Sequence, residues 1–176
     1  MRCACSEQSS EQINVRGLVA LAVLIIPFVL VLAVKNLAQH SLDFGQPIAV
    51  FPGFNLTLIF NPGVSFGLFP VGSSTGLAFM LLLQATLCLG IGVYAWTVRR
   101  QVIVWPLLLL LSGAFANVVD RFINRAVTDY VDFFLGIYHW PAFNLADVWI
   151  TFGVIGVIAV EFVLKQRDTK HLEMEG

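Results

Sequence analysis

The chain has 176 residues, of which 58% are hydrophobic and 12% charged. A soluble domain of this length could not bury so much apolar side chain around one core, so the composition indicates a membrane protein. The formal net charge is -1, and the sequence contains no basic stripe or nucleic-acid motif, which excludes nucleic acid as an expected partner.

The N-terminal segment is polar and ends where the first long apolar run begins. We interpret residues 1–16 as a flexible cytoplasmic tail. Its cysteines, Cys3 and Cys5, are too closely spaced for a complete zinc site, and Cys88 lies in an apolar run. We therefore expect no structural disulfide, no metal and no cofactor.

Four apolar segments follow, each close to the length of about 20 residues that a helix needs to cross a hydrocarbon core. Open strands cannot span lipid, because their edge amides and carbonyls would lack partners there. The sequence therefore predicts an all-α membrane protein whose membrane domain covers residues 17–164, followed by a second cytoplasmic tail at residues 165–176. The predicted transmembrane helices are residues 17–34, 75–98, 102–119 and 145–164.

The distribution of lysine and arginine predicts the orientation of these helices. One side of the membrane receives Arg2, Arg16, Arg99, Arg100, Lys165, Arg167 and Lys170, and the other receives Lys35, Arg121 and Arg125. Because positive charge accumulates on the inner side, both termini are predicted to be cytoplasmic.

The first outer connection, about residues 37–74, has the pattern of a small extracytoplasmic β-hairpin. Residues 48–51 and 54–60 have the composition of short strands around Pro52 and Gly53. Residues 64–69 are too few to span the bilayer and too apolar for water, so we expect a short interfacial helix that acts as a mobile lid.

The second outer connection, about residues 122–144, is rich in aromatic residues, which suit the headgroup level. Polar residues of the apolar part of the chain gather at the same depth. They are Asn61, Asn117, Asp120, Arg121, Asp129, Asp132, Asn144 and Asp147. Because carboxylates near hydrocarbon are costly, several at one level indicate a functional site.

Three sequence stretches at this level resemble the bacterial lipoprotein signal peptidase family, also called signal peptidase II. NPGVSFGLF at residues 61–69 is similar to the family's N-x-G-x-x-F block. GAFANVVDRFINRAVTDYVDFF at 113–134 is similar to G-x-x-x-N-x-x-D-R followed by V-x-D, and FNLADVWI at 143–150 is similar to F-N-x-A-D-x-x-I. The blocks occur in order between the predicted helices, as in a divergent member of that family.

The resemblance implies a membrane aspartyl endopeptidase of the bacterial inner membrane, which removes signal peptides from diacylglyceryl-modified prolipoproteins by cleaving before the lipidated cysteine. It would bind that prolipoprotein and membrane lipid, and act as a monomer. The catalytic pair would be Asp129 and Asp147, near the outer leaflet, with residues 122–144 as the catalytic loop. The implied supporting or substrate-binding residues are Lys35, Asn61, Gly63, Asn117, Asp120, Arg121 and Asn144.

Two carboxyl groups can hydrolyse a peptide bond without a nucleophilic side chain, because one takes a proton from water while the other donates one to the substrate. Two acids close together in a low-dielectric site share a proton and titrate as a pair. His40, His139 and His171 are scattered, so neither a metal site nor a serine mechanism with a histidine base is expected.

Each polar residue also has a simpler interpretation. Asn144 and Asp147 have the spacing of a helix cap and an acid in the first turn. Asp120 and Arg121 could form an interfacial ion pair that keeps Asp120 ionised, and Asp132 could be a solvated loop acid. For the whole protein, the alternatives are a non-catalytic relative that binds lipidated protein or lipid in the same groove, and a small transporter or channel.

Three positions depart from the family pattern. Val31 stands where an aspartate normally precedes the lysine by four residues, so Lys35 lacks its expected local partner. Ala116 and Arg125 replace glycines, and an arginine matters there if the position requires a positive φ. We expect these changes to alter stability or substrate choice and to leave the proposed acids in place.

Overall fold

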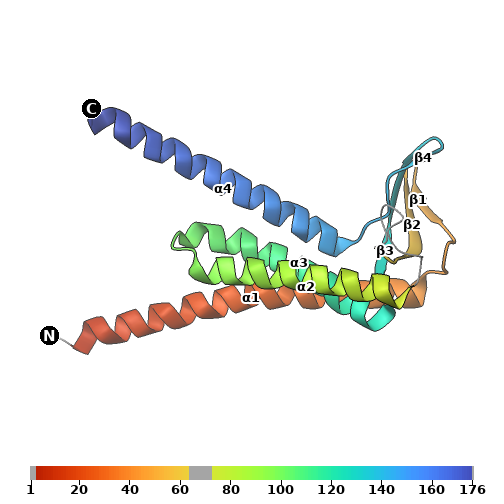
Figure 1. Cartoon of the computed structure of the whole chain (residues 1–176), viewed down its shortest axis with the longest axis horizontal. Helices are drawn as coiled ribbons and strands as arrows, with labels where there is room; N and C mark the ends of the chain where they lie inside the picture. Colours follow the sequence, from red (N-terminus) through yellow and green to blue (C-terminus); the bar gives the residue numbers. More distant parts are fainter. Residues whose placement is uncertain (1–2, 64–72, 176) are drawn as a thin grey trace.

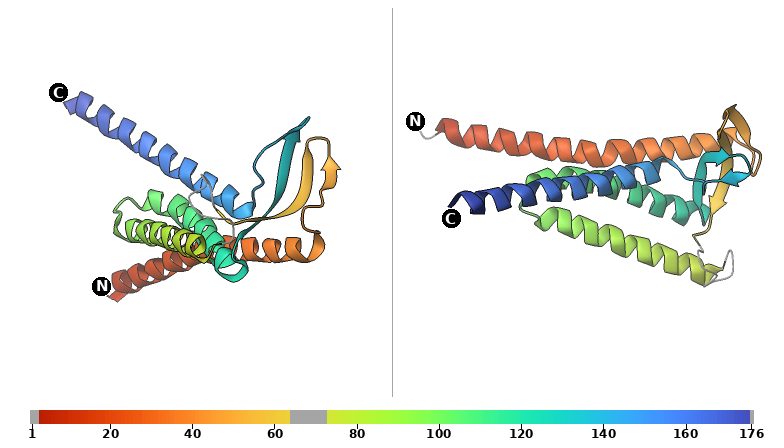
Figure 2. Two further views of the ribbon diagram at one scale, coloured as in Figure 1. Left: turned by 45° about the vertical axis from the view of Figure 1, so that its right-hand side comes forward. Right: turned by 90° about the horizontal axis from the view of Figure 1, so that it is seen from above.

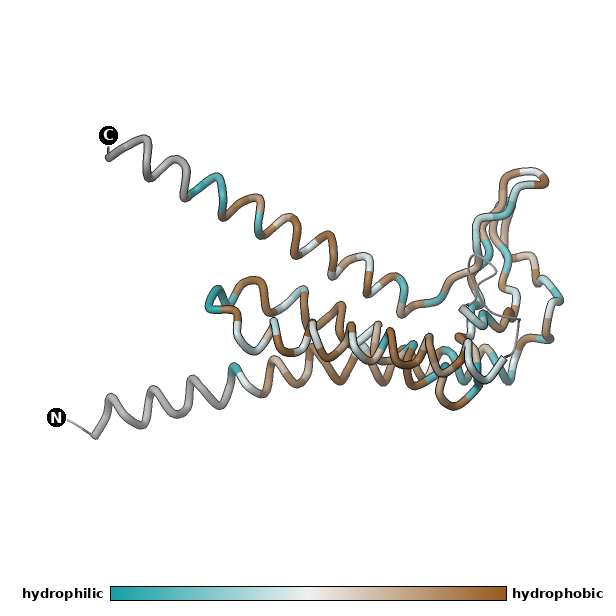
Figure 3. Tube along the Cα trace, in the orientation of Figure 1, coloured by the Kyte–Doolittle hydropathy of each residue, from teal (hydrophilic) through white to brown (hydrophobic). Residues whose placement is uncertain are grey.

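Four long helices form the body of the molecule (Figure 1). The computed structural model describes residues 3–63 and 73–175, with side chains described for 16–63 and 73–167. The helices are α1 (Cys3–Ser41), α2 (Ser74–Thr97), α3 (Gln101–Asn124) and α4 (Leu145–Glu175). Each contains a stretch of 23 to 26 residues that is long and apolar enough to cross a membrane, and Figure 3 shows the hydrophobic character of these stretches. The four predicted transmembrane helices are confirmed.

Two of the helices extend beyond the predicted spans. Helix α1 includes the described part of the N-terminal tail, from Cys3 onward, and α4 likewise continues to Glu175. A helix satisfies its own backbone hydrogen bonds, so it does not have to end where the apolar residues end. The interfacial helix predicted at residues 64–69 lies outside the described residues.

A small antiparallel sheet covers one end of the helices (Figures 1 and 2). Its strands are β1 (Ile48–Phe51), β2 (Phe54–Asn61), β3 (Val127–Leu135) and β4 (Tyr138–His139), paired in that order. The predicted hairpin of β1 and β2 is therefore confirmed. The second outer connection is not only a loop, because its β-branched and aromatic residues form β3, which pairs with β2. The sheet thus joins the connection between α1 and α2 to the connection between α3 and α4.

Helix α3 lies at the centre of the bundle and packs against the other three helices. Two glycines permit its close approach to α4: a Cβ added at Gly113 would lie 2.5 Å from the Ala146 carbonyl oxygen, and one at Gly153 would lie 2.5 Å from the Leu110 Cβ. Near the sheet, α1, α3 and α4 meet at a fully buried cluster of Val31, Ala116 and Ala146. Two of the departures from the family pattern, Val31 and Ala116, therefore serve as apolar packing.

Candidate active site

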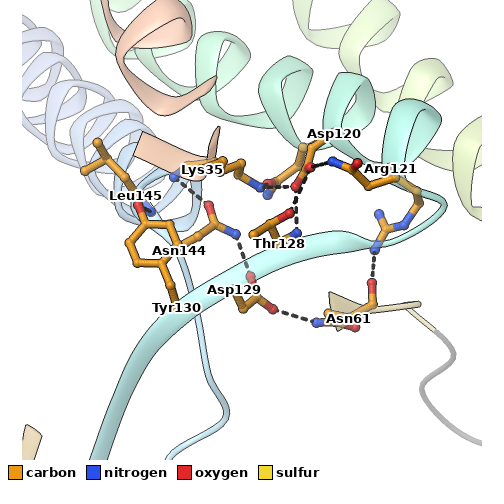
Figure 4. A network of polar contacts seen from close by, with 12 residues as sticks. Lys35, Asn61, Asp120, Arg121, Thr128, Asp129, Tyr130, Asn144 and Leu145 are labelled. Carbon is orange, nitrogen blue, oxygen red and sulfur yellow. Dashed lines mark hydrogen bonds and ion pairs between the residues drawn. The ribbon is translucent and has the colours of Figure 1, made fainter. Parts of the chain in front are cut away.

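Asp129 lies on β3 with 3% of its surface exposed. Its Oδ1 accepts a 2.6 Å hydrogen bond from the side-chain amide of Asn144, and its Oδ2 accepts one of 3.1 Å from Asn61 (Figure 4). The strand register explains the second contact, because Asn61 pairs with Val127 and Asp129 is two residues further along the same face. The pairing of β2 with β3 thus brings the Asn61 amide to the carboxyl group.

Asp147 lies in the first turn of α4, three residues after Asn144, which caps the helix. Asn144 accepts a 2.7 Å hydrogen bond from the Ala146 N–H through Oδ1, while the Asn144 N–H donates to Asp147 Oδ2 at 3.0 Å. This reciprocal arrangement is a capping box, and it confirms the capping interpretation of the two residues. Asn117 of α3 donates to the remaining oxygen, Oδ1, at 3.0 Å. Capping therefore fixes the Asp147 carboxyl group without excluding a chemical role.

The two carboxyl groups meet at Asn144, which is fully buried. Its side-chain amide donates to Asp129 and its backbone amide donates to Asp147, so one residue holds both acids. Burial raises the pKa of Asp129; hydrogen bonds from Asn144 and Asn61 oppose this rise, and the nearby charge of Asp147 adds to it. Two carboxyl groups held close together, with burial favouring the protonated form of one of them, are an arrangement suited to acid–base catalysis.

Beneath this pair, Lys35 of α1 forms a buried ion pair with Asp120 of α3. The lysine is 2% exposed, and its Nζ lies 2.7 Å from Asp120 Oδ2 and 2.7 Å from Asn117 Oδ1. Lys35 therefore finds across the helix interface the partner that Val31 does not supply. Lys35 donates to Asn117 Oδ1, so the other end of the Asn117 amide, its N–H group, points toward Asp147.

Arg121 does not pair with Asp120, so that sequence prediction is wrong. Its guanidinium instead donates to the Gln84 side chain of α2 and, at 3.4 Å, to the backbone carbonyl of Asn61. Gly63 packs against this guanidinium: its φ is +76°, and an added Cβ would lie 2.8 Å from Arg121 Nη2. Only glycine fits this turn at low cost, and its N–H donates to Asn61 Oδ1 at 2.9 Å.

Arg125 occupies the position where α3 ends and the chain turns toward β3. Its φ is +60° and its ψ is 7°, which is the left-handed conformation. The condition under which this departure from glycine matters is therefore met, because the position has a positive φ. An L-residue other than glycine pays a steric cost there.

Asp132 is also on β3, but it lies three residues from Asp129 and so faces the other side of the sheet. Its exposed fraction is 7%. It accepts a hydrogen bond from the Asn55 side-chain amide at 3.0 Å, and its Oδ1 lies 2.8 Å from His139 Nδ1. The prediction of a solvated loop acid is wrong, because the pairing of β2 and β3 encloses the side chain.

A cavity of about 350 Å³ adjoins Asp147. It is lined by Trp140 and Phe143, which precede α4, and by the outer turns of α4 at Val148, Thr151 and Phe152. A second, apolar cavity of about 430 Å³ lies among α1, α2 and α3, away from the acids. Among the side chains described for residues 16–63 and 73–167, no cluster of three or more histidine, cysteine or acidic groups could hold a metal ion.

The structure brings together the two predicted acids and the seven implied supporting residues, leaves Asp132 on the other face of the sheet, and adds four residues. Thr128 and Tyr130 flank Asp129: Thr128 binds Asp120, and the Tyr130 hydroxyl accepts a 3.0 Å hydrogen bond from the Leu145 N–H at the start of α4. Burial raises the pKa of Tyr130. The other two are Gln39 and Gln84, polar residues on the apolar helices α1 and α2. A polar side chain within an apolar helix is the sequence signal that could have identified these two residues as part of the site.

Comparison with known proteins gives consistent matches. The family described as Signal peptidase (SPase) II matches residues 19–163. Lipoprotein signal peptidases of Hydrogenovibrio crunogenus and Desulforapulum autotrophicum are each 39% identical, over 141 and 148 residues that cover 77% and 81% of this chain and 80% and 91% of the relatives. Two solved structures described as bacterial membrane enzymes studied by the in meso method have a TM-score of 0.71 at 22% identity, and cover 81% and 86% of this chain and 91% of each neighbour. The fold is therefore shared with these membrane enzymes.

Proposed function

The chain belongs to the signal peptidase II family, which removes signal peptides from prolipoproteins, and we propose that it performs this cleavage as an aspartic endopeptidase with Asp129 and Asp147 as catalytic residues. Its substrate is a diacylglyceryl-modified prolipoprotein, cut before the lipidated cysteine. The observation that carries the proposal is that Asn144 binds both carboxyl groups, one through its side chain and one through its backbone.

The surroundings of the two acids support different roles. Asp147 accepts two N–H groups and lies at the N-terminal end of α4, where the helix dipole stabilises a carboxylate. Asp129 has neutral amide partners and a raised pKa, which favours the protonated acid. We assign Asp147 as the general base and Asp129 as the general acid.

In this mechanism the Asp147 carboxylate takes a proton from a water molecule as the water oxygen attacks the carbonyl carbon of the residue before the lipidated cysteine. Asp129 donates its proton to the carbonyl oxygen. The tetrahedral intermediate then collapses: Asp129 recovers that proton, and the proton held by Asp147 passes to the leaving cysteine nitrogen. Both acids end in their starting states.

The remaining site residues hold the two acids through hydrogen bonds. Lys35 and Asp120 hold the Asn117 amide against Asp147. Asn61 holds Asp129, and Gly63 and Arg121 hold the turn that carries Asn61. Hydrogen bonds of this kind restrict a catalytic group to its productive position.

We further propose that residues 17–164 form the peptidase domain, with both termini cytoplasmic and the acids near the outer leaflet of the bacterial inner membrane. The asymmetry of lysine and arginine supports this orientation. The cavity beside Asp147 includes exposed residues of α4, namely Thr151 and Phe152, and would give lipid-attached substrate access from the side. Both acids come from one chain, so a monomer is sufficient.

The test is cleavage of a purified diacylglyceryl-modified prolipoprotein by the full chain in lipid, with the product masses measured. The wild type is expected to release the signal peptide at the bond before the modified cysteine. Asp129→Asn and Asp147→Asn should each lower kcat by about 10³-fold or more, because each removes a group that transfers a proton in the transition state. Asp132→Asn is the matched control on the same strand and should stay within about three-fold of wild type. Normal turnover by either catalytic variant would overturn the assignment.

A further inference from the structure

The outer end of α1 is joined to the start of β3 by a hydrogen bond that the mechanism above does not use. The Gln39 side-chain amide donates to Thr128 Oγ1 at 2.6 Å. Thr128 is fully buried and immediately precedes Asp129. A contact from α1 therefore reaches the residue next to the proposed general acid.

Thr128 is held at the same time by Asp120 of α3. Its N–H donates to Asp120 Oδ2 at 2.6 Å, and its hydroxyl lies 3.0 Å from Asp120 Oδ1. A hydroxyl has one proton, which it donates to the carboxylate, so its lone pairs remain free to accept the N–H of Gln39. The three groups thus form a chain with a fixed direction, from Gln39 through Thr128 to Asp120 (Figure 4 shows the Thr128–Asp120 part).

Gln39 lies four residues after Lys35, and residues at this spacing share one face of a helix. Helix α1 therefore reaches Asp120 twice, directly through Lys35 and indirectly through Gln39 and Thr128. The indirect contact through Gln39 and Thr128 lies where the chain enters β3. In the turn just before it, Arg125 adopts an unfavourable left-handed conformation. A turn under strain does not by itself fix the position of the strand that follows.

We propose that Gln39 is a positioning residue for the cleavage reaction: by holding Thr128 against Asp120, it fixes the start of β3 and so the position of Asp129 relative to Asn144 and Asp147. This inference rests on the proposed roles of the two acids. It assigns to Gln39 no contact with substrate.

The experiment compares Gln39→Leu, which keeps the size of the side chain and removes the donor, with wild type in the full chain. We expect kcat to fall about ten-fold with KM within about two-fold, since a small displacement of a catalytic group is costly and substrate contacts are unchanged. Asn36→Leu, at an exposed position on the same helix, is the matched control and should leave both constants unchanged. Wild-type kcat in Gln39→Leu would overturn the proposal.

Thr128 provides an independent check if Gln39→Leu does not fold. Thr128→Val removes the hydroxyl and should lower kcat like Gln39→Leu, whereas Thr128→Ser keeps it and should retain wild-type kcat. In the double variant Gln39→Leu/Thr128→Val, the loss should not exceed that of Thr128→Val alone, because Thr128→Val already removes the hydrogen bond that Gln39→Leu removes. Equal activity of the Val and Ser variants, or additive losses, would contradict the proposal. Activity in Asp147→Asn would instead overturn the mechanism on which it rests.

Discussion

The two faces of β3 carry carboxyl groups that the protein holds in opposite ways. On one face, burial raises the pKa of Asp129, and its partners are the neutral amides of Asn61 and Asn144. On the other face, burial also raises the pKa of Asp132, but hydrogen bonds from His139 and then Asn55 outweigh it, so the net pKa is lowered. A carboxyl group enclosed by this sheet can therefore have a raised or a lowered pKa, and its hydrogen-bond partners decide which of the two results.

This difference separates a structural acid from one suited to chemistry. Asp132 is stabilised as an anion beside a histidine that is 53% exposed, and it contributes to the outer face of the sheet. Burial raises the pKa of Asp129 and so favours its protonated form, which is the form that can donate a proton. The following changes test or weaken this contrast, from the largest expected effect to the smallest.

Removing the buried cation below the Asp129 face should have the largest effect on stability. In Lys35→Met, the buried Asp120 carboxyl group loses its ionic partner, and breaking a buried pair in this way costs about 3–5 kcal/mol. Chemical denaturation in detergent, monitored by circular dichroism, would measure the loss. Adding Asp120→Asn removes the unpaired charge and should recover part of the stability. If Lys35→Met were as stable as wild type, the Lys35–Asp120 pair would not stabilise the folded protein.

Asp129→Asn should raise stability, and the gain should increase with pH. The pKa of Asp129 is raised in the folded protein, so its contribution is fully present below the unfolded pKa of about 4 and is lost as pH rises through the folded value. Asparagine does not ionise, so the variant escapes this loss, which grows by up to about 1.4 kcal/mol per pH unit. Melting temperatures measured from pH 4 to pH 8 would show a widening difference; a constant difference would contradict it.

Asp132→Asn should behave with the opposite sign. Because the pKa of Asp132 is lowered in the folded protein, its stabilising contribution is present above the unfolded pKa of about 4 and disappears as pH falls through the folded value. The variant should therefore be less stable than wild type at pH 6 by about 0.5–1 kcal/mol, with no difference near pH 2. The same melting series provides the measurement. A variant as stable as wild type at pH 6 would remove the contrast between the faces.

Arg125→Gly should give a small gain in stability at the turn where β3 begins. Glycine adopts φ near +60° without the steric cost of about 1–2 kcal/mol that arginine pays, but it loses about 0.5–1 kcal/mol to the entropy of the unfolded chain. The expected net gain is about 0.5–1 kcal/mol, with kcat unchanged. Urea denaturation measures the gain, and Arg125→Ala, which lacks the freedom of glycine, serves as the control. Equal stability of the Gly and Ala variants would argue against strain at this position.

Much of the fold follows from local patterns in the sequence. The apolar segments predict the four spanning helices, because lipid requires a chain to satisfy its own backbone hydrogen bonds over a fixed thickness. The hairpin of β1 and β2 follows from alternation around Pro52 and Gly53. The motif residues of the site are equally local signals, since Asp129, Asp147 and Asn144 each lie in a recognisable block.

The contacts between these elements were decided only by the tertiary structure. No local pattern shows that β3 would pair with β2 and turn Asp129 toward Asn61 while Asp132 faces away, because a strand's two faces are assigned by its neighbour. Nor does spacing show that Lys35, lacking an acid four residues before it, would pair with Asp120 in place of Arg121. The sequence by itself determined which groups are present and near which helix ends they lie. Helix packing and strand register determined which of them touch, because a buried charge takes the partner that the packed backbones bring within reach.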